Sequence, residues 1–568
     1  MARPEKIRLG DILVQQKLLT EEQLKQTLEE QKKTGRRLGH VLIEKGFITE
    51  EQISKALARQ LGAAYVDLKH YNIKREVIAK LPETQARRFR AMVLEDKGEV
   101  YTVGMADPTD LTAYDEITRL LRKEIELAVV TETELLRAID RSYRRTEQIT
   151  GLAQELGADI GDSGAIDFAA LATTPGAEEA PVVKLLQTVF EDATQARASD
   201  IHIEPQERRL QIRFRIDGVL HLQTETDHKI ASAVVLRLKL MSGLDIAEKR
   251  MPQDGRFAIK IRNTAVDVRI STMPTQHGES VVMRLLNQSG GILGLDNIGI
   301  PEDMLVKVRE VIHRPSGMVL VTGPTGSGKT TTLYAALNEL NTAERKIITV
   351  EDPVEYRLPG INQVQINEKI ELTFDRVLRS ALRQDPDVVL VGEMRDEKTV
   401  ETGLRAAMTG HMVFSTLHTN DAASTPVRLL DMGAPRYMVA LSLQLVIAQR
   451  LVRVICESCI EDYQPLPSEH EWLRSELGDD VDKHVYRRGR GCSYCNGTGY
   501  VGRTGIYEML EMTKPVVEAA NQENIQQFMQ IARKQLAGRT LRHHAAQLAA
   551  AGKTSPDEAM RVSSQLAD

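Results

Sequence analysis

The segment GPTGSGKT at residues 323–330 constrains the fold more than any other feature of the sequence. Its glycines, Lys329 and Thr330 have the spacing of a phosphate-binding loop. An apolar run precedes the segment and a helix-forming run follows it, which is the strand–loop–helix context that this motif requires. From about residue 291 onward, buried-type strands alternate with helices. This pattern predicts a wound α/β core with the loop at the end of one strand.

The loop predicts a nucleotide site that takes ATP together with Mg²⁺. Backbone amides at a helix N-terminus bind phosphate, Lys329 should reach the β and γ phosphates, and Thr330 should ligate the metal. The predicted ATP-binding residues are Gly323, Pro324, Thr325, Gly326, Ser327, Gly328, Lys329, Thr330 and Thr331.

Two acidic stretches follow the loop, ITVEDPVEY and DPDVVLVGEMRD. The second ends a buried-type strand in Gly392-Glu393, as a Walker B strand does, but with glycine at the usual aspartate position. Phosphoryl transfer needs one carboxylate to hold the hydrated Mg²⁺ and another group to orient the attacking water. We assign Glu393 to the metal and Glu355 to the water, while Asp352 fits a helix cap equally well.

Two histidines lie in the segments that follow, His411 in TGHMVF and His418 in STLHTND. Either imidazole could sense the γ-phosphate, although a single histidine is more often a structural residue. We retain His418 as the candidate catalytic residue.

All four cysteines lie in two Cys-x-x-Cys pairs, Cys456 with Cys459 and Cys492 with Cys495. Four thiolates in paired knuckles suit a closed, tetrahedral Zn²⁺ site of structural type. A disulfide is disfavoured in a reducing cytosol, and redox chemistry would not need two pairs. The cysteines therefore predict a zinc subdomain.

A stretch near the start of the chain occurs twice, as RLGDILVQQKLLTEEQLKQTLEEQ at 8–31 and RLGHVLIEKGFITEEQISKALARQ at 37–60, with 10 of 24 positions identical. Thr20 with Gln23 and Thr49 with Gln52 fit capping boxes. Each copy therefore predicts a short amphipathic helix. Packing alone does not explain the Arg-Leu-Gly before each helix or the glutamine at its end.

Composition is that of an ordinary globular protein, with 42% hydrophobic and 27% charged residues among 568. No apolar run reaches the roughly 18 residues of a spanning helix, and the first residues have no apolar signal core. We expect a cytosolic protein that reaches the inner membrane only through partners. A formal charge of -6 does not favour nucleic acid as a partner.

The predicted fold class is a multidomain α/β protein. A helical repeat (1–65) precedes a small α/β module (66–145), and a linker rich in Gly, Ala, Thr and acidic residues (146–180) leads to a strand-rich domain (181–290). The phosphate-binding loop domain covers 291–568 and includes the cysteine subdomain at 453–505.

The motifs from the phosphate-binding loop to TGHMVFSTLHTNDA, together with ASDIHIEP (198–205) and EKRMPQDGR (248–256), resemble the GspE/PilB family of secretion and type IV pilus assembly ATPases. The resemblance covers about residue 181 to the C-terminus. It implies a RecA-like core, a smaller PAS-like α+β domain before it and hexameric rings. It also implies that Arg269 and Arg284 reach the phosphates. The cysteine insertion is similar to that of the assembly-type members.

The repeats resemble the cyclic di-GMP-binding domain of the MshE-type (MSHA pilus) ATPases. A two-fold symmetric ligand suits two copies of one surface, with arginines on the guanines, glycines near phosphate and leucines under the rings. The departures are Lys17 where glycine is usual, His40 opposite Asp11, and Ile53 for leucine. The predicted ligand-binding residues are Arg8, Leu9, Gly10, Asp11, Leu13, Leu24, Leu28 and Gln31, with Arg37, Leu38, Gly39, His40, Leu42, Ile53, Leu57 and Gln60.

The leading function is therefore an ATPase motor that drives pilus assembly through an inner-membrane platform protein and responds to cyclic di-GMP as an allosteric ligand. A type II secretion motor is the alternative within the family. A nucleic-acid translocase would share the core but should carry a basic stripe. The repeats could also be a docking module without a ligand.

Overall fold

The computed structural model describes residues 9–16, 18–34, 38–69, 71, 75–78, 80–143, 149, 152, 181–261, 264–287, 293–492 and 494–564. The chain splits into two compact units: one comprises 1–197, 456–460 and 489–499, and the other comprises 198–455, 461–488 and 500–568. Among the described helices, none is both long enough and apolar enough to cross a bilayer. Most of the predicted linker lies outside the described residues.

Each N-terminal repeat folds into two helices, so the expectation of one helix per copy is incomplete. The capping boxes are confirmed: the Gln23 amide donates to Thr20 Oγ1 (3.2 Å) and the Gln52 amide to Thr49 Oγ1 (3.3 Å), and each glutamine side chain accepts from its threonine amide. The Leu-Gly of each copy begins the preceding helix. The helices are α1 (Leu9–Gln15), α2 (Glu21–Thr34), α3 (Leu38–Glu44) and α4 (Glu50–Leu61).

The two repeats share one core. Helix α1 packs on α4, and α2 packs on α3, so each copy buries its apolar face against the other copy. Equivalent positions fill this core, namely Leu13 with Leu42, Leu19 with Ile48, and Leu24 with Ile53. The duplicated sequence therefore builds a single four-helix unit.

A small four-stranded sheet follows the repeats, as the sequence predicted. Its strand order is β1-β4-β3-β2, and the β2–β3 hairpin is antiparallel while β1, β3 and β4 are parallel. Glu50 ties helix α4 to this module by accepting hydrogen bonds from the Thr133 amide (3.0 Å) and hydroxyl (2.6 Å). The elements are β1 (Ala64–Tyr65), α5 (Arg75–Ile78), α6 (Glu83–Phe89), β2 (Ala91–Asp96), β3 (Val100–Met105), α7 (Leu111–Leu121), β4 (Glu124–Val129) and α8 (Glu132–Ser142), with α11 (Pro181–Gln195) further along the chain.

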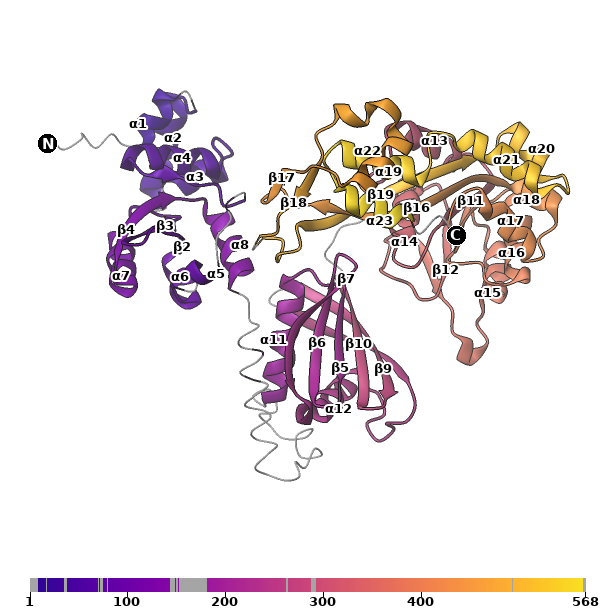
Figure 1. The fold of residues 1–568 in the computed structure, drawn as a ribbon, viewed down its shortest axis with the longest axis horizontal. Helices are drawn as coiled ribbons and strands as arrows, with labels where there is room; N and C mark the ends of the chain where they lie inside the picture. Colours follow the sequence, from indigo (N-terminus) through magenta and orange to yellow (C-terminus); the bar gives the residue numbers. More distant parts are fainter. Residues whose placement is uncertain are drawn as a thin grey trace. The chain divides into compact units, whose positions relative to one another are not determined.

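A six-stranded antiparallel sheet precedes the nucleotide-binding core in the sequence, in the order β7-β6-β5-β10-β9-β8. An Asp217-Gly218 turn joins β6 to β7, and both residues have positive φ (48° and 86°), as a tight two-residue hairpin requires. Helix α12 packs against this sheet (Figure 1). The elements are β5 (Asp200–Pro205), β6 (Arg209–Ile216), β7 (Val219–Asp227), α12 (Ala231–Ser242), β8 (Gln253–Ile261), β9 (Thr264–Thr275) and β10 (Gly278–Asn287).

The core around the phosphate-binding loop is a seven-stranded sheet in the order β13-β12-β14-β15-β11-β16-β19, with helices on both faces (Figure 1). All neighbouring strands are parallel except β16 and β19. The elements are α13 (Glu302–Ile312), β11 (Gly317–Thr322), α14 (Lys329–Leu340), β12 (Ile347–Glu351), β13 (Asn362–Gln365), α15 (Phe374–Ala381), β14 (Val388–Val391), α16 (Glu397–Met408), β15 (Met412–Leu417), α17 (Ser424–Asp431), α18 (Arg436–Ser442) and β16 (Leu443–Ile455).

Two long antiparallel strands, β16 and β19 (Tyr500–Glu511), flank the cysteine insertion in the sequence. The insertion and the C-terminal segment contain β17 (Ile460–Asp462), α19 (Pro467–Leu477), β18 (Arg487–Gly489), α20 (Lys514–Ala520), α21 (Ile525–Leu536), α22 (Leu541–Ala550) and α23 (Pro556–Ser564).

Candidate functional site

The phosphate-binding loop joins the buried strand β11 to helix α14. Glycine is required at its first position, because Gly323 has a φ of 142° and a Cβ there would lie 2.4 Å from Gln449 O. Lys329 Nζ donates to Gly323 O (2.7 Å) and Pro324 O (3.2 Å), so the ammonium lies over the loop. Burial lowers the pKa of Lys329 to about 8, and Glu393 opposes that shift. The loop is shaped for a phosphate that the ammonium can reach.

A buried glutamine on the neighbouring strand β16 forms hydrogen bonds with the loop and with the first turn of α14. Gln449 is 1% exposed, donates from Nε2 to Ser327 O (2.7 Å) and accepts from the Thr332 hydroxyl (2.7 Å). Sequence reasoning missed this role, because Gln449 lies 117 positions beyond Thr332. The only signal was a polar residue inside an apolar run.

Three strands besides β11 end at the same edge of the sheet, because β11, β12, β14 and β15 are parallel. The acid at the end of β12, Glu351, is buried and accepts hydrogen bonds from the hydroxyls of Tyr334 and Thr349 and from Gln363 Nε2 (3.3 Å). Its oxygens are thus occupied within the protein. Glu351 holds the strand end in place, whereas Glu355 follows in the half-buried segment after the strand.

Glu393 and His418 follow β14 and β15 at this same edge. His418 Nε2 lies 3.8 Å from Glu393 Oε2, and Arg395 forms an ion pair with the other carboxylate oxygen. Burial lowers the pKa of His418, and the nearby Lys329 ammonium lowers it further. The structure therefore brings together the lysine, the acid and the histidine that the sequence nominated.

Steric contact with the neighbouring strand explains why glycine occupies the usual Walker B aspartate position. A Cβ at Gly392 would lie 3.2 Å from Val350 O, which also accepts the Gly392 amide at 2.7 Å. A side chain there would press on the backbone of β12.

The second histidine lies at the opposite edge of the sheet. His411 directly precedes β15, and its Nδ1 is 3.0 Å from Ala406 O. This contact ties the end of α16 to the start of the strand, which is a structural role far from the loop.

A cavity of about 340 Å³ opens beside the loop, large enough for a small ligand. The first turn of α14 contributes Gly328 and Thr331, while Leu451 and the Gly502–Gly505 segment come from β16 and β19. Sequence reasoning did not predict this cavity, because its walls come from segments that are distant in the chain. It is the right size for the nucleoside of a nucleotide whose phosphates occupy the loop.

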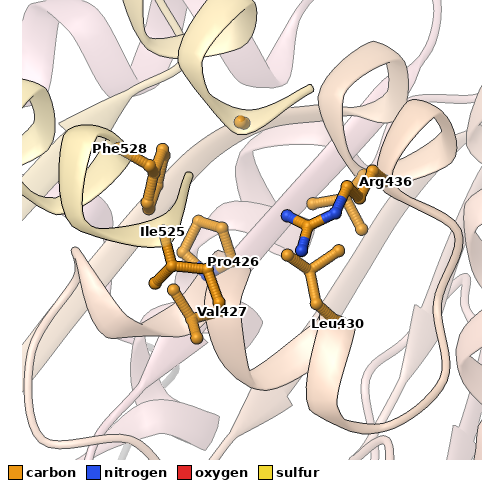
Figure 2. Close-up of a pocket in the computed structure, with 8 residues that line it drawn as sticks. Pro426, Val427, Leu430, Arg436, Ile525 and Phe528 are labelled. Atoms are coloured by element: carbon orange, nitrogen blue, oxygen red, sulfur yellow. The ribbon is translucent and has the colours of Figure 1, made fainter. Parts of the chain in front are cut away.

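A second pocket lies between α17 and α18 on one side and α20 and α21 on the other (Figure 2). Val427, Leu430, Ile525 and Phe528 line it, and Arg436 donates to Gln522 O (3.2 Å) at its margin. Its volume is about 10 Å³, which is close to the space of one water molecule. This pocket is a small gap between packed helices and cannot hold a nucleotide.

The two arginines implied by the resemblance lie on neighbouring strands, directly opposite each other. Arg269 on β9 forms an ion pair with Glu355 (2.9 Å) and donates to Val354 O (2.8 Å). Arg284 on β10 donates to Asp200 Oδ1 (2.9 Å) and is 55% exposed. Glu355, nominated to orient water, is therefore engaged by an arginine here.

The four cysteines form one buried cluster with all sulfurs within 4.8 Å of one another. The sulfur separations of 3.8 Å (456–492), 3.9 Å (459–495) and 3.7 Å (492–495) match the ~3.8 Å edge of a tetrahedron with Zn–S bonds of about 2.3 Å. The amides of Gly491, Cys492 and Gly499 donate to sulfur at 3.1–3.2 Å, which stabilises thiolates. Both the spacing and the donor set fit a zinc ion.

The predicted cyclic di-GMP residues that the structure describes differ in burial. Leu13 and Leu42 are fully buried and Ile53 nearly so, in the core that the repeats share, while Leu28 is 39% exposed. Gly10 allows close packing of helices, because a Cβ there would lie 2.8 Å from Leu24 Cδ1. Leu38, Gly39, Leu57 and Gln60 are partly exposed. Arg8, Arg37 and the side chains of Leu9, Asp11, Gln31 and His40 lie outside what the structure describes.

The turn that departs from the usual pattern can be compared only in the second copy. Gly46, the counterpart of Lys17, has a φ of 69°, which glycine adopts without strain. Lys17 itself lies outside the described residues.

Two family models match the chain. The model of the type II/IV secretion system protein (T2SSE) matches residues 176–561, and that of the MshEN domain matches residues 61–149. The first covers the antiparallel sheet, the nucleotide-binding core and the cysteine insertion. The second covers the small α/β module and begins where the repeats end.

Curated relatives are similar over most of their length. The type IV pilus assembly ATPase PilB of Myxococcus xanthus is 41% identical over 513 residues, which is 89% of each chain. The type II secretion system ATPase E of Vibrio cholerae is 40% identical over 505 residues, or 87% of this chain and 98% of that one.

A solved structure adds a likeness of fold. The ATPase DotB of Legionella pneumophila has a TM-score of 0.51 at 20% identity, and the match covers 67% of this chain and 96% of that chain. A structure of MshE with cdg is 39% identical, with a TM-score of 0.23, over 24% of this chain and 99% of that chain.

Proposed function

The chain belongs to the family of type II/IV secretion system proteins, as an ATPase with an MshEN domain, and on this basis we propose that it is a cytoplasmic, hexameric motor for type IV pilus assembly. The motor would work through an inner-membrane platform protein and respond to cyclic di-GMP, as in an MSHA-like system. Hexamer formation and the platform partner are what the resemblance to pilus and secretion motors implies.

The observation that carries the ATPase assignment is the convergence of Lys329, Glu393 and His418 at one edge of the sheet. In the proposed mechanism the loop amides and Lys329 bind the phosphates, and Thr330 would hold Mg²⁺, which supplies charge to the developing transition state. Glu393 would orient the hydrated metal. The adjoining cavity would hold the nucleoside.

Glu355 would act on water only after Arg269 leaves it. The ion pair at 2.9 Å occupies one carboxylate oxygen, so a phosphate that attracts Arg269 would free the acid. ATP binding could thereby couple closure of the smaller domain to activation of water.

A type II secretion motor is the second candidate, since the chain is about equally identical to a pilus relative and a secretion relative. The MshEN domain favours the pilus reading. We expect a null strain of the source organism to lose surface pili, visible by electron microscopy, while its secreted proteins stay unchanged. Loss of exported proteins with normal piliation would assign the chain to secretion instead.

The repeats support the cyclic di-GMP proposal through their near-equivalent halves. Two copies of one surface, joined in a single four-helix unit, match a ligand with two-fold symmetry. Because Leu13 and Leu42 are buried, the ligand would rest on the exposed ends of the apolar stripe, such as Leu28, rather than on the core.

Calorimetry on the full chain should show binding of cyclic di-GMP. Arg8→Ala and Arg37→Ala should each weaken it by about 1–3 kcal/mol, the size of a bidentate contact with guanine. Lys25→Ala, an exposed cation on the same unit, serves as the control. Absence of heat with cyclic di-GMP, in a preparation that hydrolyses ATP, would leave the repeats as a docking module.

A further inference from the structure

Five charged residues form one row across the six-stranded sheet. In the register of the strands, Arg256 on β8 lies opposite Arg269 on β9, which lies opposite Arg284 on β10. Arg284 lies opposite Asp200 on β5, and Asp200 lies opposite Arg215 on β6. Directly opposed residues of antiparallel strands project from the same face, with Cβ atoms about 4.5–5.5 Å apart. The row thus places four guanidinium groups and one carboxylate side by side.

The single carboxylate of the row, that of Asp200, interacts with the arginines at one end of the row. Asp200 accepts from Arg284 Nε at 2.9 Å and lies 3.8 Å from Arg215 Nε. Its side chain is only 6% exposed, so it is committed to these neighbours. The charge of Arg256 and Arg269 is not balanced by any acid of the row.

Arg256 is the least engaged of these arginines. In the described part of the chain its guanidinium makes one long hydrogen bond, from Nη1 to the neutral Gln365 Oε1 at 3.5 Å. Its side chain is exposed, whereas Arg269 is 18% exposed and paired with Glu355. Burial lowers the pKa of Arg269, Glu355 opposes the shift, and the Arg256 charge adds to the lowering. The positive charges of Arg256 and Arg269 therefore repel each other in this arrangement.

Like charges directly opposite on a sheet destabilise it. Arg284 is paired with Asp200 and Arg269 with Glu355, and an anion with several oxygens that binds across the three arginines would relieve the remaining repulsion, since guanidinium groups bind phosphate oxygens in a bidentate manner. A terminal phosphate has three oxygens and can therefore accept hydrogen bonds from a third guanidinium group besides the two arginines implied by the family resemblance.

We propose that Arg256 is a third phosphate-binding arginine, which acts with Arg269 and Arg284 on the γ-phosphate of ATP. The inference rests on the proposed ATPase function and adds a residue to it. Three guanidinium groups on one phosphate make the site sensitive to the γ-phosphate, so Arg256 distinguishes ATP from ADP.

The test compares Arg256→Gln and Arg256→Lys in the full-length protein. We expect Arg256→Gln to bind a non-hydrolysable ATP analogue about 10-fold or more weakly, the usual loss for one hydrogen bond to a charged group. ADP affinity should change less than about two-fold, because ADP lacks the γ-phosphate. Arg256→Lys should recover part of the loss, since it restores the charge without the planar fork.

Lys260→Gln is the matched control, because Lys260 is exposed on the same strand and the same face, four residues further along. It should leave both affinities unchanged. An Arg256→Gln variant that binds the ATP analogue as tightly as the wild type would overturn the proposal. Equal weakening of ADP and the analogue would also overturn it, since that outcome indicates a structural role. A wild-type protein without ATP hydrolysis would instead refute the proposed function.

Discussion

Lys329→Ala should lower ATP hydrolysis by about 10²-fold or more while the protein remains folded. Among the described residues the ammonium donates hydrogen bonds to two loop carbonyls, Gly323 O and Pro324 O, so its removal opens no cavity in a core. Its charge instead faces the site where negative charge develops during phosphoryl transfer. Steady-state phosphate release measures the loss, and circular dichroism checks the fold.

The control is Lys514→Ala, which removes a lysine that is 88% exposed on α20. It should hydrolyse ATP at the wild-type rate. Glu393→Gln provides a second comparison: it keeps Lys329 and should bind ATP but turn it over slowly, because metal positioning matters more in the transition state. Unchanged turnover in Lys329→Ala would contradict the assigned role of the loop.

The lowered pKa of Lys329 adds a pH signature to this prediction. With a pKa of about 8 in the free enzyme, the ammonium is present below pH 8 and is lost as pH rises through that value. ATP affinity should therefore weaken across this range in the wild type, since the neutral amine attracts phosphate less. In Lys329→Ala the same pH range should leave the affinity flat.

Cys459→Ser should destabilise the cysteine subdomain far more than it affects nucleotide binding. The free energy of metal binding by four thiolates contributes to the free energy of folding, and it amounts to about 10–16 kcal/mol in small zinc modules. Losing one of four ligands in the buried cluster should therefore lower the melting temperature and expose the insertion to proteolysis.

Glu457→Gln is the control, since Glu457 is exposed between the two cysteines of the first knuckle. Elemental analysis of the pure wild type should find about one zinc per chain. Zinc-free protein with normal stability would show that the cluster is not a metal site.

Local chemistry made several features predictable. The phosphate-binding loop requires glycine at particular positions and a strand and helix around it, so β11 and α14 could be placed from the residues alone. The capping boxes at Thr20 and Thr49 were readable because their hydrogen bonds join residues three apart. The cysteine spacing likewise predicted the cluster, since each knuckle is local.

Other features depend on contacts between distant segments. In the sequence, Gln449 only interrupts an apolar run. The pairing of β16 with β11 brings its side chain within hydrogen-bond distance of Ser327 and Thr332. The cavity beside the loop combines five separate stretches in the same way. No local signal marks such residues, because their partners lie more than a hundred positions away.

The sequence by itself determined the α/β class, the nucleotide chemistry of the loop, the two cysteine pairs and the duplicated helix starts, because each depends on residues that lie close together in the chain. The tertiary structure decided which acid remains available, since Glu351 is saturated by hydroxyls and Glu355 is held by Arg269. It also decided that the two repeats share one core and that three arginines align across the sheet. Strand register and helix packing set these contacts, and both are fixed by burial of apolar surface between segments that are remote in the chain.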